Sequence, residues 1–428
     1  MFPQLIRWMK LRTAVPEVRV LLSNFFSLSL LQAANFILPL LTLPYLVRVL
    51  GYERFGLLAF ATATVAYFQI LTEYGFNLSA TREIAINKGN QEKLNEIFSS
   101  VMFIKIALTT LSLSVLAILL LTVDLLARDW IIYVLTFGVV VGQVFLPVWF
   151  FLGIERMKYI TLFNVIAKLI FTLAIFLFVK SEKDHFLVPL LTSLGYLMVA
   201  FWSLFVISKK FKVELVIPTK ERIFYHLRGG WYVFVSNAAV SLYTMTTIVL
   251  LGFFTNNLIV GYYSIADKLI NAVKSVNNPI AQTLYPYVNR KAIRSMPNTL
   301  IFIRKILIGM VIGMGLISFI IFFFSMDLID LLFGRFSFQS VIILRILSVI
   351  PLMVGVDTIL GTLMMLIFNR NREYSHIIIS AGFVNLVISF FLIFQWEHIG
   401  AAISVLITEC YITVRLLLYT QKNGLSLR

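Results

Sequence analysis

The chain has 428 residues, of which 60% are hydrophobic and 13% are charged, and it carries a net charge of +16 and a single cysteine. Soluble globular proteins have about 45–50% apolar and about 25% charged residues, so this composition excludes a soluble enzyme, a disordered chain and a disulfide scaffold. It predicts a polytopic membrane protein whose positive charge reflects basic cytoplasmic loops. We therefore expect no nucleic acid as a partner.

Apolar segments long enough to cross a bilayer follow one another along the whole chain. A span needs about 20 apolar residues. Segments of this kind lie at 20–44, 55–79, 97–121, 131–152, 159–179, 186–207, 231–255, 258–282, 306–325, 338–368, 375–395 and 399–419. The tenth contains Pro351, Gly355 and Gly361, so we expect it to be kinked.

The twelve expected helices form two sets of six on either side of the longest polar segment. We therefore predict an all-α membrane protein with two six-helix bundles. The predicted parts are a cytoplasmic N-terminus at 1–19, an N-lobe at 20–207, a basic cytoplasmic linker at 208–230, a C-lobe at 231–419 and a cytoplasmic tail at 420–428.

The distribution of Lys and Arg predicts the orientation of the chain in the membrane. The loops on the same side as the N-terminus hold 24 of these residues, and the opposite loops hold 6. Because basic loops stay in the cytoplasm, we expect both termini to be cytoplasmic.

The two halves are related by a shift of 205 residues, which indicates a parallel repeat. The second predicted helix carries Thr62, Ala66, Gln69, Glu73 and Asn77 on one face. Adding 205 gives Asp267, Asn271, Lys274, Asn278 and Gln282 of the eighth helix. The same shift takes Gly56 to Gly261.

Polar residues along helices 1, 2, 7 and 8 predict a central aqueous cleft between the two bundles, because lipid cannot satisfy their hydrogen bonds. The expected cleft residues are Gln32, Asn35, Gln69, Asn237, Asn271, Asn278 and Gln282. The alternative is that such residues only hold neighbouring helices together.

Basic residues inside the predicted spans indicate an anionic substrate. A charge at mid-bilayer costs at least about 2.5–3.5 kcal/mol, so retaining several implies a wet cavity or a fixed anion. The residues are Lys105, Lys168, Lys268, Lys274 and Arg345, with Arg48 at the outer rim of the first helix. The carboxylates that could neutralise them in ion pairs instead, or exchange a coupling ion, are Asp267, Asp357, Glu73 and Glu409.

Motifs for soluble catalysis are missing from the sequence. There is no P-loop and no HExxH pattern, and the four histidines lack metal-ligand spacing. We therefore expect a protein that is not an enzyme and has no resident cofactor or metal.

Several motifs resemble those of O-antigen flippases, in the multidrug/oligosaccharidyl-lipid/polysaccharide exporter superfamily. They are NFILPLLTLPYLVRVLGYERFGL (35–57), EYGFNLSATREIA (73–85), PVWFFLGIERMKYIT (147–161), VSLYT (240–244), NPIAQTLYP (278–286) and IGAAISVLITE (399–409).

The resemblance implies a V-shaped pair of bundles in the bacterial inner membrane. It also implies transport of an undecaprenyl-pyrophosphate-linked oligosaccharide by alternating access, coupled to protons or sodium ions. The other expected partners are membrane lipids and glycan polymerases or assembly proteins. On this reading the cations offset the pyrophosphate charge, the amides bind sugar hydroxyls, and Asp267 is the first choice for the coupling carboxylate because it shares a face with Lys274.

Two alternatives stay open. A drug/cation antiporter of the same superfamily would have an acidic, aromatic cleft, which the cationic surplus disfavours. A membrane-embedded glycan polymerase or ligase would carry a large periplasmic loop, and every predicted outer loop is short.

Overall fold

The computed structural model of the chain describes residues 16–334, 337–423 and 425, without the side chains of 16–29, 31, 33, 35, 36, 239, 242 and 243. The side chain of Asn35, a predicted cleft residue, is therefore not among those described. Most of the predicted N-terminal tail also lies outside the described residues.

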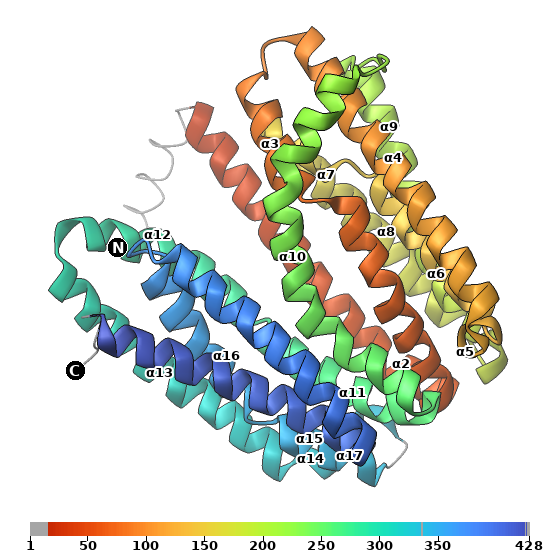
Figure 1. Cartoon of the computed structure of the whole chain (residues 1–428), viewed down its shortest axis with the longest axis vertical. Coiled ribbons are helices and arrows are strands. Elements are labelled where there is room, and N and C mark those ends of the chain that lie inside the picture. Colours follow the sequence, from red (N-terminus) through yellow and green to blue (C-terminus); the bar gives the residue numbers. More distant parts are fainter. Residues whose placement is uncertain (1–15, 335–336, 424, 426–428) are drawn as a thin grey trace, which may run out of the picture. The chain divides into compact units, whose positions relative to one another are not determined.

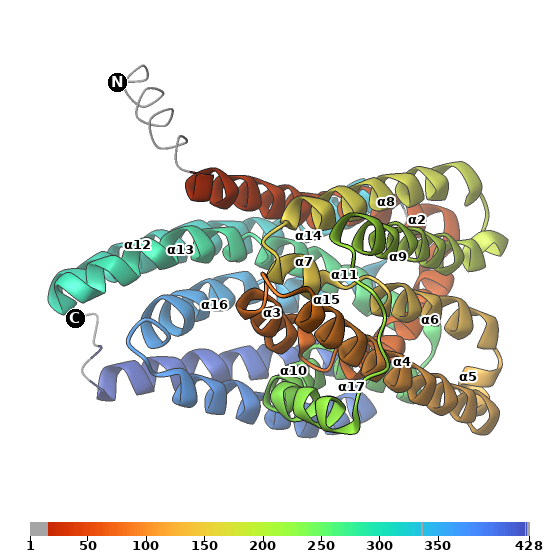
Figure 2. The ribbon, with the colours of Figure 1, turned by 90° about the horizontal axis from the view of Figure 1, so that it is seen from above.

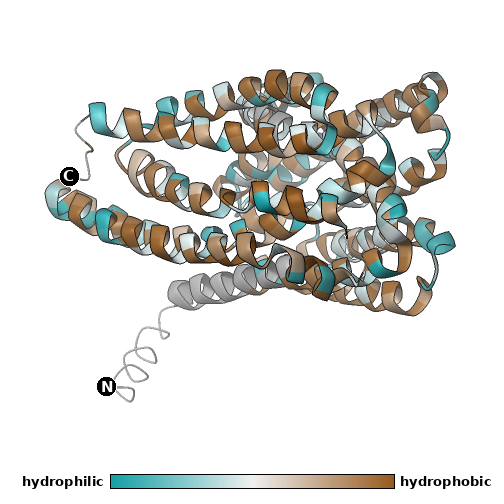
Figure 3. Ribbon diagram, turned by 90° about the horizontal axis from the view of Figure 1, so that it is seen from below, coloured by the Kyte–Doolittle hydropathy of each residue, from teal (hydrophilic) through white to brown (hydrophobic). Residues whose placement is uncertain are grey.

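All regular structure in the described part of the chain is helical. Eight helical segments there are long and apolar enough to cross a membrane, and hydrophobic residues run along the helices while hydrophilic ones gather towards their ends (Figure 3). Two of the eight have about twice the usual length, Ile37–Ile86 and Asn371–Lys422. Each contains residues with non-helical backbone angles, Gly51 in the first and Trp396 and Glu397 in the second. The chain is therefore a multi-pass membrane protein.

By contacts between Cα atoms the chain divides into two compact units, residues 1–43 with 65–237 and residues 44–64 with 238–428. This division differs from the predicted lobes because residues 44–64 pack with the second unit. The long helix α10 (Lys220–Phe254) contributes its first half to the first unit.

The first unit contains most of α2 (Pro16–Glu73) and the helices that follow it, several of which lie side by side (Figure 1). These are α3 (Phe76–Ile86), α4 (Gln91–Thr122), α5 (Asp124–Ala127), α6 (Trp130–Val144), α7 (Val148–Gly153), α8 (Met157–Phe178), a 3₁₀ turn (Glu182–Phe186) and α9 (Leu187–Phe211).

Two of the motifs that resemble the flippases pack against each other in this unit. Helix α7 buries Trp149, Phe150 and Phe151 completely. A Cβ on Gly153 would lie 2.5 Å from the Cβ of Ile84, so α3 and α7 cross closely. The hydroxyl of Thr81 also donates to the carbonyl of Trp149 at 3.1 Å. The motifs therefore form a structural core.

The second unit is built around the C-terminal helices, with α12 and α13 running alongside each other (Figure 2). Its helices are α11 (Asn257–Lys274), α12 (Asn277–Arg294), α13 (Met296–Phe323), α14 (Ser325–Phe333), α15 (Phe338–Leu347), α16 (Ile350–Asp357), a π-helix (Thr358–Met365) and α17 (Asn371–Lys422). The predicted tenth helix is thus broken near Pro351, as expected.

The two halves of α17, residues 371–395 and 398–422, are held together by small polar side chains. Asn385 donates to Thr408 and Ser389 donates to Ser404, both at 2.9 Å, and all four residues are buried. Buried hydrogen bonds of this type join helices inside membranes. The small residues of the IGAAISVLITE motif therefore pack against the first half of α17, residues 371–395.

The second and eighth predicted helices are both interrupted. The first break is at Tyr74 and Gly75, which have φ angles of 45° and 76°. The second lies between Lys274 and Asn277, so Asn278 and Gln282 belong to α12 and not to the helix that carries Lys274. The expected span 258–282 is therefore divided into two helices, although Ser275 and Val276 between them keep right-handed helical angles.

Candidate functional site

A cavity of about 370 Å³ lies within the second unit and contains several of the predicted site residues. Its polar wall comes from α11, which contributes Asp267, Lys268, Asn271 and Lys274. Successive positions are one, three and three residues apart, so they lie along one side of the helix. The other walls come from residues 59–63, from the second half of α10 and from α17.

The two lysines of this cavity have different partners. Lys274 lies 3.3 Å from Glu409 of α17, and the side chain of Glu409 is only 3% exposed. Lys268 forms no ion pair among the described residues, and its Nζ instead lies 4.8 Å from the centre of the Phe55 ring. A cation above an aromatic face is stabilised by about 0.5–2 kcal/mol, and the neighbouring Asp267 attracts Lys268 electrostatically without forming an ion pair with it.

The carboxylates of the second unit also differ in their surroundings. Asp267 accepts a hydrogen bond from the amide of Asn271 at 2.8 Å. Asp357, at the end of α16, has both carboxyl oxygens buried; the hydroxyl of Thr413 lies near them, but outside ideal hydrogen-bond geometry. Glu409 and Lys274 are close enough to act on it electrostatically. Asp357, Glu409 and Lys274 therefore form a group of two carboxylates and one ammonium, of which Glu409 and Lys274 line the cavity.

A second cavity, of about 230 Å³, lies within the first unit and holds the other predicted lysines of the spans. Lys105 of α4 and Lys168 of α8 both line it, with Glu73 at the end of α2. The side chain of Lys105 is only 3% exposed, and it forms no ion pair within the described part of the chain. The cavity thus places two cations beside one carboxylate.

Three amides and a phenol complete this cavity and were not among the predicted site residues. They are Asn77, Gln143, Asn164 and Tyr196. Asn77 belongs to the stripe that the sequence singled out, but Gln143 and Asn164 are isolated amides in apolar helices. Their polarity within apolar segments was the signal that could have identified them.

The remaining predicted residues do not line either of these two cavities. Arg48 donates from Nε and Nη2 to the carbonyls of Leu332 and Leu331, at 3.0 and 2.6 Å, and so caps the C-terminal end of α14. Arg345 is exposed and donates from Nε to the hydroxyl of Ser325 at 2.8 Å. Gln32 and Gln69 are half-buried, and Asn237, Asn278 and Gln282 are exposed.

Comparison with known proteins assigns the family. The model of the family described as polysaccharide biosynthesis protein matches residues 21–292. The chain belongs to this family. Its relatives include an Escherichia coli K12 protein and a Shigella dysenteriae protein, both named provisionally as O-antigen transporters. The first is 32% identical over 94% of this chain and 97% of its own length, and the second is 28% identical over 92% and 98%. The predicted membership among the O-antigen flippases is therefore confirmed, and the family members named here are transporters and not enzymes.

Solved structures show the same fold. Lipid II flippase MurJ in an inward closed conformation matches with a TM-score of 0.66 and 13% identity, over 94% of this chain and 87% of its own. An inward-facing multidrug resistance MATE transporter of the MOP superfamily matches with a TM-score of 0.68 and 12% identity, over 90% and 94%. The chain therefore shares its fold with a lipid II flippase and with a multidrug resistance transporter.

Proposed function

We propose that the chain is a flippase that moves an undecaprenyl-pyrophosphate-linked oligosaccharide across the bacterial inner membrane. One observation carries this proposal. Lys105 lines the cavity of the first unit and Lys268 lines that of the second, and neither lysine forms an ion pair among the described residues. Fixed cations in a membrane protein attract an anionic ligand. Two relatives named as O-antigen transporters support a glycan-bearing lipid as that ligand.

The proposed chemistry divides the substrate between two environments. The polyprenyl tail stays in the lipid, where its transfer to water would cost about 0.8 kcal/mol for each methylene. The pyrophosphate meets the lysines, with Lys168 beside Lys105 and with Lys274 beside Lys268. The sugars meet amides such as Asn271 and Asn164. Cations outside the two cavities, Arg48 and Arg345, have the structural partners described above.

The proposal includes twelve crossings, with six in each bundle and both termini in the cytoplasm. The two double-length helical segments support this number, because each divides into two at its non-helical residues. The 24-to-6 distribution of basic residues supports the orientation. Transport by alternating access, driven by proton or sodium exchange at a carboxylate, completes the mechanism.

The carboxylates that the proposal assigns to ion coupling lie beside the lysines. Asp267 and Glu409 line the cavity of the second unit, Glu73 lines that of the first, and Asp357 lies behind the Lys274–Glu409 pair. A carboxylate that exchanges its ion changes the net charge beside a lysine. Such a change lowers or raises the affinity of the lysine for a pyrophosphate. Coupling requires such a difference in substrate affinity between the ion-bound and ion-free states.

A flipping assay with purified protein tests the proposal. Lys105→Gln and Lys268→Gln are compared with Lys183→Gln, an exposed cation that lines neither cavity. Each protein is reconstituted with a fluorescent undecaprenyl-pyrophosphate-linked oligosaccharide. We expect each cavity variant to flip it at least about tenfold more slowly, because a hydrogen bond to a charged group contributes about 1.5–3 kcal/mol, and the control to match the wild type.

Two results would overturn the proposal. One is a wild-type rate in both cavity variants. The other is equally fast transport of the same oligosaccharide on an uncharged polyprenyl carrier. Export of a cationic drug by the wild type, at a rate unaffected by the glycolipid, would favour the drug/cation antiporter instead.

A further inference from the structure

A third and larger cavity, of about 960 Å³, lies in the first unit between α3 and the beginning of α10. It is distinct from the lysine-lined cavities of the proposed transport path, with which it shares no lining residue. Its walls combine basic and apolar side chains. The basic ones are Arg82, Lys220 and Arg228, and the apolar ones include Leu78, Phe224 and Val233.

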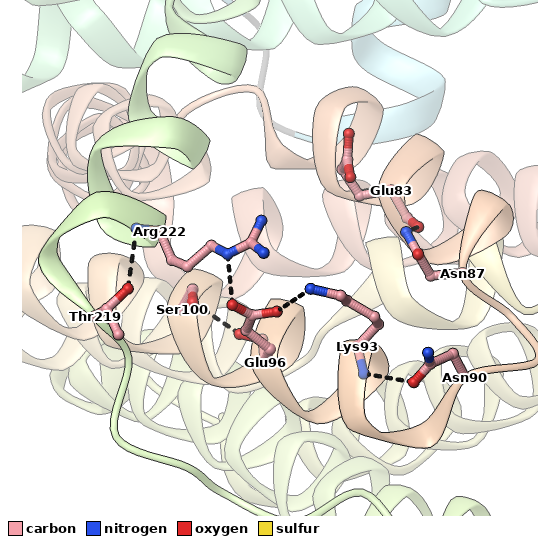
Figure 4. Close-up of polar contacts among 8 residues, drawn as sticks. All are labelled: Glu83, Asn87, Asn90, Lys93, Glu96, Ser100, Thr219 and Arg222. Carbon is pink, nitrogen blue, oxygen red and sulfur yellow. Dashed lines mark hydrogen bonds and ion pairs between the residues drawn. The ribbon is translucent and has the colours of Figure 1, made fainter.

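Two cross-links between helices fix the walls of this cavity. The phenol of Tyr225 on α10 donates to Oε1 of Glu83 on α3 at 3.0 Å. Arg222 on α10 pairs with Glu96 on α4 at 2.5 Å, and Lys93 reaches the other oxygen of Glu96 at 3.0 Å (Figure 4). The start of α10 is therefore held at a defined position against α3 and α4.

The charges around the cavity are mainly positive. Glu96 is paired with two cations, whereas Glu83, which lines the cavity, accepts a hydrogen bond from the neutral phenol of Tyr225 and keeps its charge. Arg82, Lys220 and Arg228 are exposed and form no ion pair among the described residues. Glu221 is the other acidic residue of the lining, so the cations outnumber the carboxylates there. The cavity is complementary in charge to an anion.

The apolar side chains around the cavity identify the kind of anion. Leu78 is 66% exposed and Phe224 is 62% exposed, although both line the cavity. Trp231 and Tyr232 follow on the same helix, with exposures of 49% and 82%. Trp and Tyr gather where membrane meets water, and basic clusters beside a membrane attract anionic headgroups. A ligand with a phosphate and acyl chains matches both the basic and the apolar side chains of the cavity.

We propose that this cavity binds an anionic phospholipid, with its phosphate against Arg82 and Arg228 and its acyl chains along Leu78, Phe224 and Trp231. The site anchors the junction of α3, α4 and α10 to the leaflet on the basic side of the protein. It goes beyond the proposed flippase function and does not depend on it.

Quenching of Trp231 by brominated phosphatidylglycerol tests the proposal. The full chain is purified in a neutral detergent and titrated with the brominated lipid, and the Trp231→Phe variant shows which part of the quenching comes from this residue. We expect saturable quenching in the wild type. In R82Q/R228Q the midpoint should rise at least about tenfold, because the charge-assisted hydrogen bonds to the lipid phosphate are lost.

Matched variants separate this site from general charge effects. K209Q/K210Q removes the same charge from the same basic segment outside the cavity, and its midpoint should stay within about twofold of the wild type because a neutral micelle gives these cations no anionic surface to sense. R82K/R228K keeps the charge and should retain most of the affinity. Size-exclusion chromatography checks that each variant is folded.

The proposal fails if R82Q/R228Q binds the lipid as tightly as the wild type. It also fails if brominated phosphatidylcholine quenches Trp231 at the same midpoint, because the site would then not recognise negative charge. Displacement of the lipid by millimolar inorganic phosphate would identify a site for a soluble anion and would overturn the lipid assignment.

Discussion

Gly56 and Gly261 meet at a crossing between the segments 52–64 and α11, and the contact is reciprocal. A Cβ on Gly56 would lie 1.8 Å from the carbonyl oxygen of Asn257, and a Cβ on Gly261 would lie 2.0 Å from that of Tyr52. The shift of 205 residues takes Tyr52 to Asn257 and Gly56 to Gly261. Repeat-related residues therefore face each other across the crossing, which requires glycine on both sides.

We predict that Gly56→Ala and Gly261→Ala each destabilise the protein by about 1–3 kcal/mol or more, because the two helices must separate to admit the methyl group. The thermal midpoint in detergent measures this effect. Gly309→Ala on α13 is the control, since a Cβ there meets no atom within 4 Å. It should leave the midpoint unchanged or raise it, because alanine favours a helix more than glycine does. Equal midpoints for all three variants would refute the crossing.

The Lys274–Glu409 pair gives a second prediction. Lys274→Met leaves the carboxylate of Glu409 buried without its partner, which should destabilise the protein by about 3–5 kcal/mol. The double variant Lys274→Met with Glu409→Gln should recover most of the loss, because neither charge remains. Lys268→Met serves as the matched control, since it removes a cation that forms no ion pair among the described residues and lies against the Phe55 ring, and it should cost about 0.5–2 kcal/mol. Additive losses in the double variant would show that the pair is not coupled.

Asp357 gives a prediction that separates stability from transport. Burying a carboxylate is costly when its hydrogen bonds are incomplete, and the oxygens of Asp357 are buried with only the Thr413 hydroxyl near them, outside ideal geometry. We expect Asp357→Asn to preserve the thermal midpoint or to raise it, and to abolish the acceleration of flipping by an imposed proton gradient. The exposed Asp327→Asn is the control. Gradient-driven flipping that survives Asp357→Asn would remove this residue from the coupling mechanism.

His226 predicts a pH-dependent change at the start of α10. It is buried, and burial lowers its pKa below the ordinary value of 6.5, while Glu83, Glu96 and Arg222 act on it with opposing signs. An unfolded segment therefore binds a proton more readily than the folded one. The packing of α10 is fully stable above about pH 6.5 and weakens as the pH falls below it.

Hydrogen–deuterium exchange of residues 220–233 measures this effect, after correction for the intrinsic pH dependence of exchange. Protection should decrease between neutral and acidic pH in the wild type and should change less in His226→Gln. A decrease of the same size in both proteins would assign the effect to other groups.

The sequence predicted much of this architecture because bilayer spans have an unambiguous signature of length and apolarity. The face shared by Asp267, Asn271 and Lys274 was also predictable, since it follows from helical periodicity within one unbroken helix. The prediction did not hold for Asn278, which lies on α12 beyond the turn at Ser275 and Val276 and does not line this cavity.

The partners of individual charges could not be predicted in this way. Nothing in the local sequence distinguishes Arg48, which caps a helix more than 280 residues away, from Lys105, which lines a cavity. Long-range contacts decide these roles. The third cavity was missed for a related reason, because Arg82 and Arg228 are ordinary loop cations until the fold brings α3 and α10 together.

Lys268 and Lys274 of α11 differ in their freedom to move, because Lys268 contacts the Phe55 ring whereas Lys274 pairs with Glu409. If Lys274 swings towards an incoming anion, it abandons Glu409, and an unpaired buried carboxylate opposes the motion. Lys268 leaves the Phe55 ring and the attraction of Asp267, but it breaks no ion pair among the described residues. The side chain of Lys268 can therefore move to a ligand and back at a lower energetic cost than that of Lys274, which its ion pair with Glu409 holds in place.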